Sequence, residues 1–230
     1  MTRLPIVRLA THGALAAALL CGASVALAQT EDHAPVAMKS SSKMAQDKPG
    51  SESWTYAQPR DVFTKYRTVI VEPTAVYNGP DAQFEGDISA GDRAKYAAIV
   101  TDELRSELAK SFPAPATAQA DTLRLKVTLL GAEKTKGGVA TATRVTPVGF
   151  GLSAVKSALG KGGSFTGSVL FAVEVYDART NELLIAAVRR RHPDPLDVPA
   201  TLGTDETVKA VARDFADRAR KRLEELTQVK

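Results

Sequence analysis

Histidine is the side chain best suited to act as a general base or a zinc ligand near neutral pH, and this chain has three. They are His12, His33 and His192, and no two of them stand at the spacing of a zinc-binding pair. His192 alone borders a segment that we expect to fold, beside Pro193 and Asp194. We therefore predict that His192 is an ordinary surface residue, and that the chain has no metal site and no cofactor.

Ser153 is the residue to consider for nucleophilic catalysis. It lies in Gly151-Leu152-Ser153-Ala154-Val155, which lacks the second glycine of a nucleophile elbow. The pair Gly149-x-Gly151 is not a dinucleotide fingerprint either, because no acidic partner or strand-to-helix turn accompanies it. A hydrolase would need polar groups that converge in a cleft around Ser153 or His192. These patterns favour a protein that is not an enzyme.

The charge of the chain gives little support to a nucleic-acid partner. The formal net charge is +4, and Arg3 and Arg8 account for two of these charges within a leader that we expect to be removed. The remaining chain would carry about +2, its basic residues are scattered, and few aromatic residues lie among them. We therefore expect no nucleic acid among its partners.

A long β-hairpin over residues 164–191 is the strongest folding signal. Phe165, Val169, Phe171, Val173 and Val175 share one side of an extended strand, which is the period of two of a half-buried strand. The turn-forming stretch 177–182 and a second apolar run follow. This pattern predicts a hairpin at the centre of a sheet.

Two amphipathic helices and two further strands accompany this hairpin. A helix is expected after Ser89, with Asp92 three residues later as in a capping box, and another after Gly203. Residues 68–71 predict a short strand, and alternation over 122–130 predicts one with a buried and a solvated face. The apolar helix positions are Ala97, Val100, Leu104 and Leu108 in the first helix, and Val208, Val211, Phe215, Ala219, Leu223 and Leu226 in the last. The predicted fold class is α+β, with a mainly antiparallel sheet, a long central hairpin and two amphipathic helices packed on one face.

The first residues resemble a secretory signal peptide. Arg3 and Arg8 precede an apolar stretch, and Ala26-Leu27-Ala28 fits the rule for cleavage before Gln29. A lipoprotein leader ending at Cys21 is the alternative, but Leu20 stands where a small residue is preferred, so lipid anchoring at Cys21 is disfavoured. We expect a signal peptide over 1–28, a disordered arm over 29–53 and a single α+β domain over 54–230, located in the periplasm or secreted.

The stretch from Gly137 to Gly163 is rich in glycine and poor in charge. Inside it, residues 148–159 could form a short apolar helix, too short to cross a bilayer. Two interpretations remain open. Either the stretch packs on the domain as part of its core, or it docks on a partner or a membrane surface. The residues that would form such an interaction surface are Val148, Phe150, Leu152, Val155 and Leu159.

Three stretches together resemble the family called domain of unknown function 3313 (DUF3313). They are the spaced pattern from Phe63 to Pro73 with Asp81-Ala82-Gln83-Phe84, the run 146–154, and the hairpin sequence 173–183. The resemblance covers about residues 54–226. It implies a bacterial cell-envelope protein, many members being described as lipoproteins, without any established activity or functional residues.

Two function classes follow from these observations. The first is an exported, non-enzymatic protein of the periplasm or cell envelope that binds an unidentified envelope protein or component. The alternative is a membrane-acting oligomer that uses residues 137–163. An amphipathic apolar face over 147–159 would favour the membrane-acting class, whereas burial against the sheet would favour the first.

We predict that the exported protein begins at Gln29. Mass spectrometry of the mature N-terminus measures this directly. A lipid-modified Cys21 at the N-terminus would contradict the prediction and would place the protein on a membrane.

Overall fold

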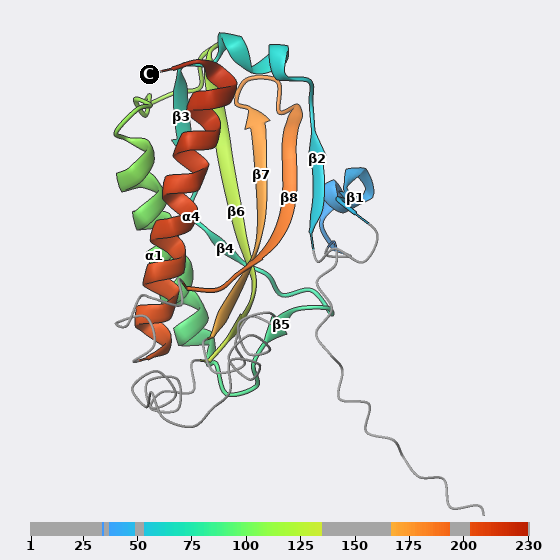
Figure 1. The fold of residues 1–230 in the computed structure, drawn as a ribbon, viewed down its shortest axis with the longest axis vertical. Helices are drawn as coiled ribbons and strands as arrows, with labels where there is room; N and C mark the ends of the chain where they lie inside the picture. The colour runs from blue at the N-terminus through green and yellow to red at the C-terminus, as the bar shows by residue number, and fades with distance from the viewer. Residues whose placement is uncertain (1–33, 35–36, 49–52, 135–166, 194–202, 230) are drawn as a thin grey trace, which may run out of the picture.

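The protein folds around one eight-stranded sheet, in a computed structural model that describes residues 34, 37–48, 53–134, 167–193 and 203–229 (Figure 1). The strands are β1 (Ala45–Gln46), β2 (Trp54–Ala57), β3 (Thr68–Val71), β4 (Ala75–Val76), β5 (Gln83–Phe84), β6 (Thr122–Glu133), β7 (Ser168–Asp177) and β8 (Leu183–Arg191). Their order is β1-β2-β8-β7-β6-β3, and β4 and β5 also pair with β6. The predicted α+β class is confirmed.

The central position of the predicted hairpin is also confirmed. Strands β7 and β8 pair antiparallel from Val169 opposite Arg191 down to the turn, and β6 pairs antiparallel with the other edge of β7. The turn places Asn181 at φ 61°, a left-handed conformation that asparagine adopts more readily than most residues. The alternating apolar side of β7 therefore lies in the middle of the sheet, as its sequence pattern indicates.

One edge of the sheet is parallel, a feature that no local sequence pattern indicates. Strands β3, β4 and β5 all run parallel to β6, and α1 (Ala90–Leu108) connects them to it. Parallel strands need such a crossover because the chain must return to the same end of the sheet. The sheet is thus mainly antiparallel, with one β-α-β unit at its edge.

Both predicted helices pack on the same face of this sheet (Figure 1). Helix α1 begins with a capping box in which Ser89 and Asp92 bond each other's backbone amides, and α4 (Thr204–Thr227) follows Gly203. On α4, Phe215 stacks on Phe171 of β7 with ring centroids 5.1 Å apart. The main core lies between the helices and this face, where aromatic stacking adds to the burial of apolar area.

The opposite face of the sheet is covered in part by residues 37–48, which corrects the predicted disorder for that portion of the arm 29–53. Residues 37–48 form the 3-10 turn η1 (Lys39–Lys43) and β1, and Met44 is buried there. Met44 packs with Tyr77, Leu170 and Val188 in a second apolar cluster. The composition of this arm is polar, and its few apolar residues form no regular pattern. In the fold these residues pack against the apolar side chains on this face of the sheet.

This cover also changes the prediction of half-buried strands. Leu170 and Ala172 on the second face of β7 are as well buried as Phe171 on the first, and Thr128 of β6 is buried too. Sequence alternation marks the face under the helices, but the second face is buried by segments from distant parts of the chain.

We predict that Phe171→Asp unfolds the domain, because a carboxylate would replace a ring buried against Phe215. An unpaired buried charge costs several kcal/mol, which is comparable with the whole stability of a domain, about 5–15 kcal/mol. Circular dichroism melting measures the effect. Lys209→Asp, which places the same carboxylate on an exposed position of α4, is the control and should melt close to the wild type. Equal melting of Phe171→Asp and wild type would contradict the strand assignment.

Candidate functional site

The residues singled out from the sequence lie mostly outside the described part of the chain. This holds for the contact residues Val148, Phe150, Leu152, Val155 and Leu159, and also for His12, His33, Cys21 and Ser153. His192 is described and is exposed just after β8, consistent with a surface residue. Within the described residues, no group of three or more His, Cys, Asp or Glu side chains is placed to hold a metal ion.

The two ends of the Gly-rich stretch are placed side by side by the sheet. Glu133, the last residue of β6, pairs across the strands with Ser168, the first residue of β7. The Ser168 hydroxyl donates to Glu133 Oε2 at 2.8 Å. Residues 135–166 therefore leave and re-enter the sheet at neighbouring positions, at the end opposite the β7–β8 turn.

A nearly buried arginine holds these two ends together. The Arg190 side chain is 9% exposed, and its guanidinium donates to Ser168 Oγ at 2.8 Å and Gln83 Oε1 at 2.6 Å and lies 3.3 Å from Glu133 Oε1. It thereby connects β5, β6, β7 and β8. A charge-assisted network of this kind is strong when every member is satisfied, so it fixes where the Gly-rich stretch begins and ends.

A bulge in β6 makes this arrangement fit. The register of β6 against β7 shifts between Leu129 and Gly131. A side chain at Gly131 would have its Cβ 2.3 Å from the backbone oxygen of Gln83, so β5 approaches β6 too closely for any other residue. The glycine is therefore what lets Gln83 reach Arg190.

A second polar group occupies the face of the sheet opposite the helices, near the β7–β8 turn. Arg124 of β6 lies over the Tyr176 ring at 4.6 Å and forms an ion pair with Glu72. Beside it, Lys126 pairs with Glu174 Oε2 at 3.1 Å. Arg124 lies opposite Tyr176, and Lys126 lies opposite Glu174, across the β6–β7 pairing. Strand β6 thus supplies both cations, and β7 supplies the ring and the carboxylate.

The charged side chains of this group are held in fixed positions by their partners. Glu174 is only 3% exposed, and the Tyr176 hydroxyl donates to its Oε1 at 2.7 Å. Burial, followed by this hydrogen bond, raises the pKa of Tyr176 above its ordinary value, so the phenol stays protonated. Arg124 and Lys126 occupy the side of 122–130 that the alternation predicts to be solvated, but no sequence signal connects them with Glu174 and Tyr176.

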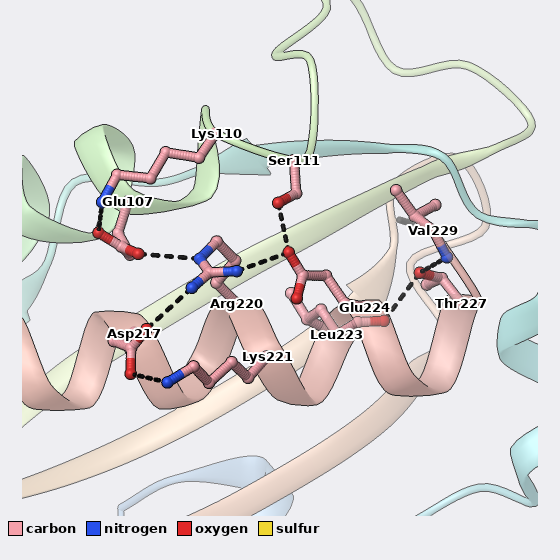
Figure 2. Close-up of polar contacts among 10 residues, drawn as sticks. All are labelled: Glu107, Lys110, Ser111, Asp217, Arg220, Lys221, Leu223, Glu224, Thr227 and Val229. Atoms are coloured by element: carbon pink, nitrogen blue, oxygen red, sulfur yellow. Dashed lines mark hydrogen bonds and ion pairs between the residues drawn. The ribbon is translucent and has the colours of Figure 1, made fainter.

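A third polar network joins the two helices (Figure 2). Arg220 of α4 reaches Glu107 of α1 at 2.8 Å and its own helix neighbours Glu224 at 2.7 Å and Asp217 at 2.9 Å. Hydrogen bonds from Lys110 and Arg220 lower the pKa of Glu107, which keeps this carboxylate charged.

An ion pair and a hydrogen bond further along the helices show that the two helices run parallel. Lys95 near the start of α1 pairs with Asp205 at the start of α4, and Ser111 after the end of α1 bonds Glu224 near the end of α4. Arg220, in the C-terminal half of α4, therefore helps to pair the two helices.

The β7–β8 turn is fixed by one buried carboxylate. Asp177 accepts hydrogen bonds from the Arg179 and Thr180 amides at 2.9 Å, from the Tyr66 hydroxyl at 2.8 Å and from Lys65 at 3.2 Å. Burial alone would raise the pKa of Asp177, but these hydrogen bonds outweigh it and hold the pKa well below its ordinary value of 3.8. This carboxylate has a structural role, since it ties the turn to the segment before β3.

Comparison with known proteins gives one family. The family model described as "Protein of unknown function (DUF3313)" matches residues 37–219. No curated protein matches the chain.

Two solved structures of PelC dodecamers from Paraburkholderia phytofirmans are similar at 13% identity. One, a single-residue variant, covers 77% of this chain and 97% of its own, with a TM-score of 0.35. The other covers 72% of this chain and 96% of its own, with a TM-score of 0.36.

We predict that Asp177→Asn lowers the unfolding free energy at neutral pH by about 1.5–3 kcal/mol, the usual contribution of a hydrogen bond to a charged group. Because the folded-state pKa is depressed, the carboxylate stabilises the fold above the unfolded pKa of about 3.9, and this stabilisation is lost as the pH falls below it. The wild type should therefore lose stability more steeply in acid than Asp177→Asn, as measured by urea unfolding at several pH values. Asp102→Asn, the same change at an exposed position of α1, is the control; an acid response like that of the control would show that Asp177 is not the group responsible.

Proposed function

The chain belongs to the DUF3313 family, and from this premise we propose that it is an exported, non-enzymatic protein of the periplasm or cell envelope that binds a protein or an envelope component. The leader pattern of residues 1–28 supports export. The family description names no activity, and the support for binding lies in this chain's own residues.

The observation that carries the proposal is the anchoring of residues 135–166. Their two ends leave the sheet at paired positions, where Arg190 bonds both strands. Residues 135–166 lie outside the described part of the chain, and their sequence combines apolar side chains with few charges, a composition that suits a contact surface. We propose that Val148, Phe150, Leu152, Val155 and Leu159 form the interaction surface.

The use of the described carboxylates supports a role without catalysis. Glu107, Glu174 and Asp177 each neutralise a lysine or arginine that holds two elements together. A general acid or base must exchange its proton during a reaction, whereas these groups are held in one charge state by their partners. Their geometry suits a rigid scaffold that presents a binding segment.

The double variant Phe150→Ser, Leu152→Ser tests the interaction surface. We expect its unfolding free energy to stay within about 1 kcal/mol of the wild type, while its retention on envelope fractions is lost. Leu104→Ser, at a fully buried position of α1, provides the scale for loss of core packing, about 2–5 kcal/mol. Co-sedimentation with envelope fractions and urea unfolding are measured on all three proteins.

Two outcomes would contradict the proposal. A double variant destabilised like Leu104→Ser would place the segment in the core, and one that still binds the envelope would place the contact elsewhere. Protein-free phospholipid vesicles in the same assay distinguish the partner: Phe150- and Leu152-dependent retention on them would favour the membrane-acting alternative. In the described part of the chain, no helix is both long and apolar enough to cross a membrane.

A further inference from the structure

Arg191 is the last residue of β8, and its guanidinium is partly buried without a negatively charged partner among the described residues. It pairs with Val169 on the face of the sheet that the helices cover, two residues beyond Arg189 on the same side. Its side chain is half-buried, and its Nε atom is buried without a hydrogen-bond partner. This differs from its neighbour Arg190, whose guanidinium is satisfied by Glu133, Ser168 and Gln83.

The other arginines beside Arg191 already have their own carboxylates. Arg189 bonds Asp47 at 2.9 Å, and Arg218 of α4 donates through Nε to both oxygens of Asp214, at 2.9 and 2.8 Å. Burial, then Arg218 and Arg189, lower the pKa of Arg191, and Asp214 offsets this in part. Arg191 therefore feels the positive charges of Arg218 and Arg189 and forms no ion pair with any described residue.

An unpaired, partly buried guanidinium is costly, because it has lost water without gaining an acceptor. Its planar fork matches an oxyanion in two-point contact. An anion placed between Arg191 and Arg218 would accept hydrogen bonds from the Arg191 guanidinium. Its negative charge would also reduce the repulsion between the two guanidinium groups. A phosphate group suits this better than a carboxylate, because it offers more acceptor oxygens and more negative charge to two guanidinium groups at once.

We propose that Arg191, with Arg218 beside it, binds a phosphate group from outside this chain. The same chemistry is present in free phosphate and in the headgroup of an anionic phospholipid, and the experiment separates these sources. The site lies on the helix-covered face and uses no residue of the segment proposed to bind an envelope partner, so either proposal can fail without the other.

The test measures thermal unfolding of the full chain in sodium phosphate and in sodium chloride at equal ionic strength. A ligand that binds the folded state raises the midpoint, so the wild type should melt higher in phosphate. Arg191→Met keeps the aliphatic length and removes the charge. It should melt higher than the wild type in chloride, because the buried unpaired cation is gone, and it should show no extra response to phosphate.

The control is Arg213→Met, an exposed arginine of α4 whose contact with Glu103 is 4.0 Å; it should keep the phosphate response. Vesicle co-sedimentation then compares phosphatidylglycerol with phosphatidylcholine. Binding to phosphatidylglycerol that Arg191→Met abolishes, without a response to free phosphate, would assign the headgroup as the source. An equal phosphate response in wild type and Arg191→Met would show adventitious surface binding and overturn the proposal, as would a wild type that responds to neither probe.

Discussion

Strand β7 is buried on both of its faces, and the need to cover both faces determines how the rest of the chain is arranged. On one face, Phe171 and its neighbours lie under α1 and α4. On the other, Leu170 and Ala172 lie under residues of the N-terminal part of the chain, including Met44, and under Tyr77. The apolar area removed from water in this double layer is the dominant stabilising term, so elements far apart in sequence are held to the same strand.

Arginine side chains then connect elements that burial alone would leave free to slide. Arg220 links the two parallel helices, and Arg190 links four strands at the end of the sheet where residues 135–166 begin and end. Each is surrounded by enough acceptors to compensate for its partial loss of water. Arg191 is placed in a comparable environment without such acceptors, and this contrast between neighbouring residues is what points to an external anion.

These two features suit the proposed role of presenting residues 135–166 to a partner. The described sheet and helices form a scaffold in which Glu174 and Asp177 are each held by more than one partner, and Arg190 and Arg220 are paired with carboxylates. A scaffold of this kind can present a segment to a partner with little loss of its own order, which reduces the entropic cost of binding. The paired residues Glu133 and Ser168, on either side of 135–166, supply the attachment point for such a segment.

The sequence by itself determined the elements whose signals are local. Alternation in 169–175 and helical spacing around Leu104 and Phe215 predicted the central hairpin and the two helices, because each burial pattern repeats within one element. The capping residues Ser89 and Asp92 set the start of α1 for the same reason. The tertiary structure decided what depends on contacts between distant residues. It folded 37–48 onto the second face of the sheet, where a polar composition had suggested disorder, and it joined Arg190 to Gln83 and Glu133. No local pattern encodes such pairings, since they arise only when strands far apart in the chain become neighbours in the sheet.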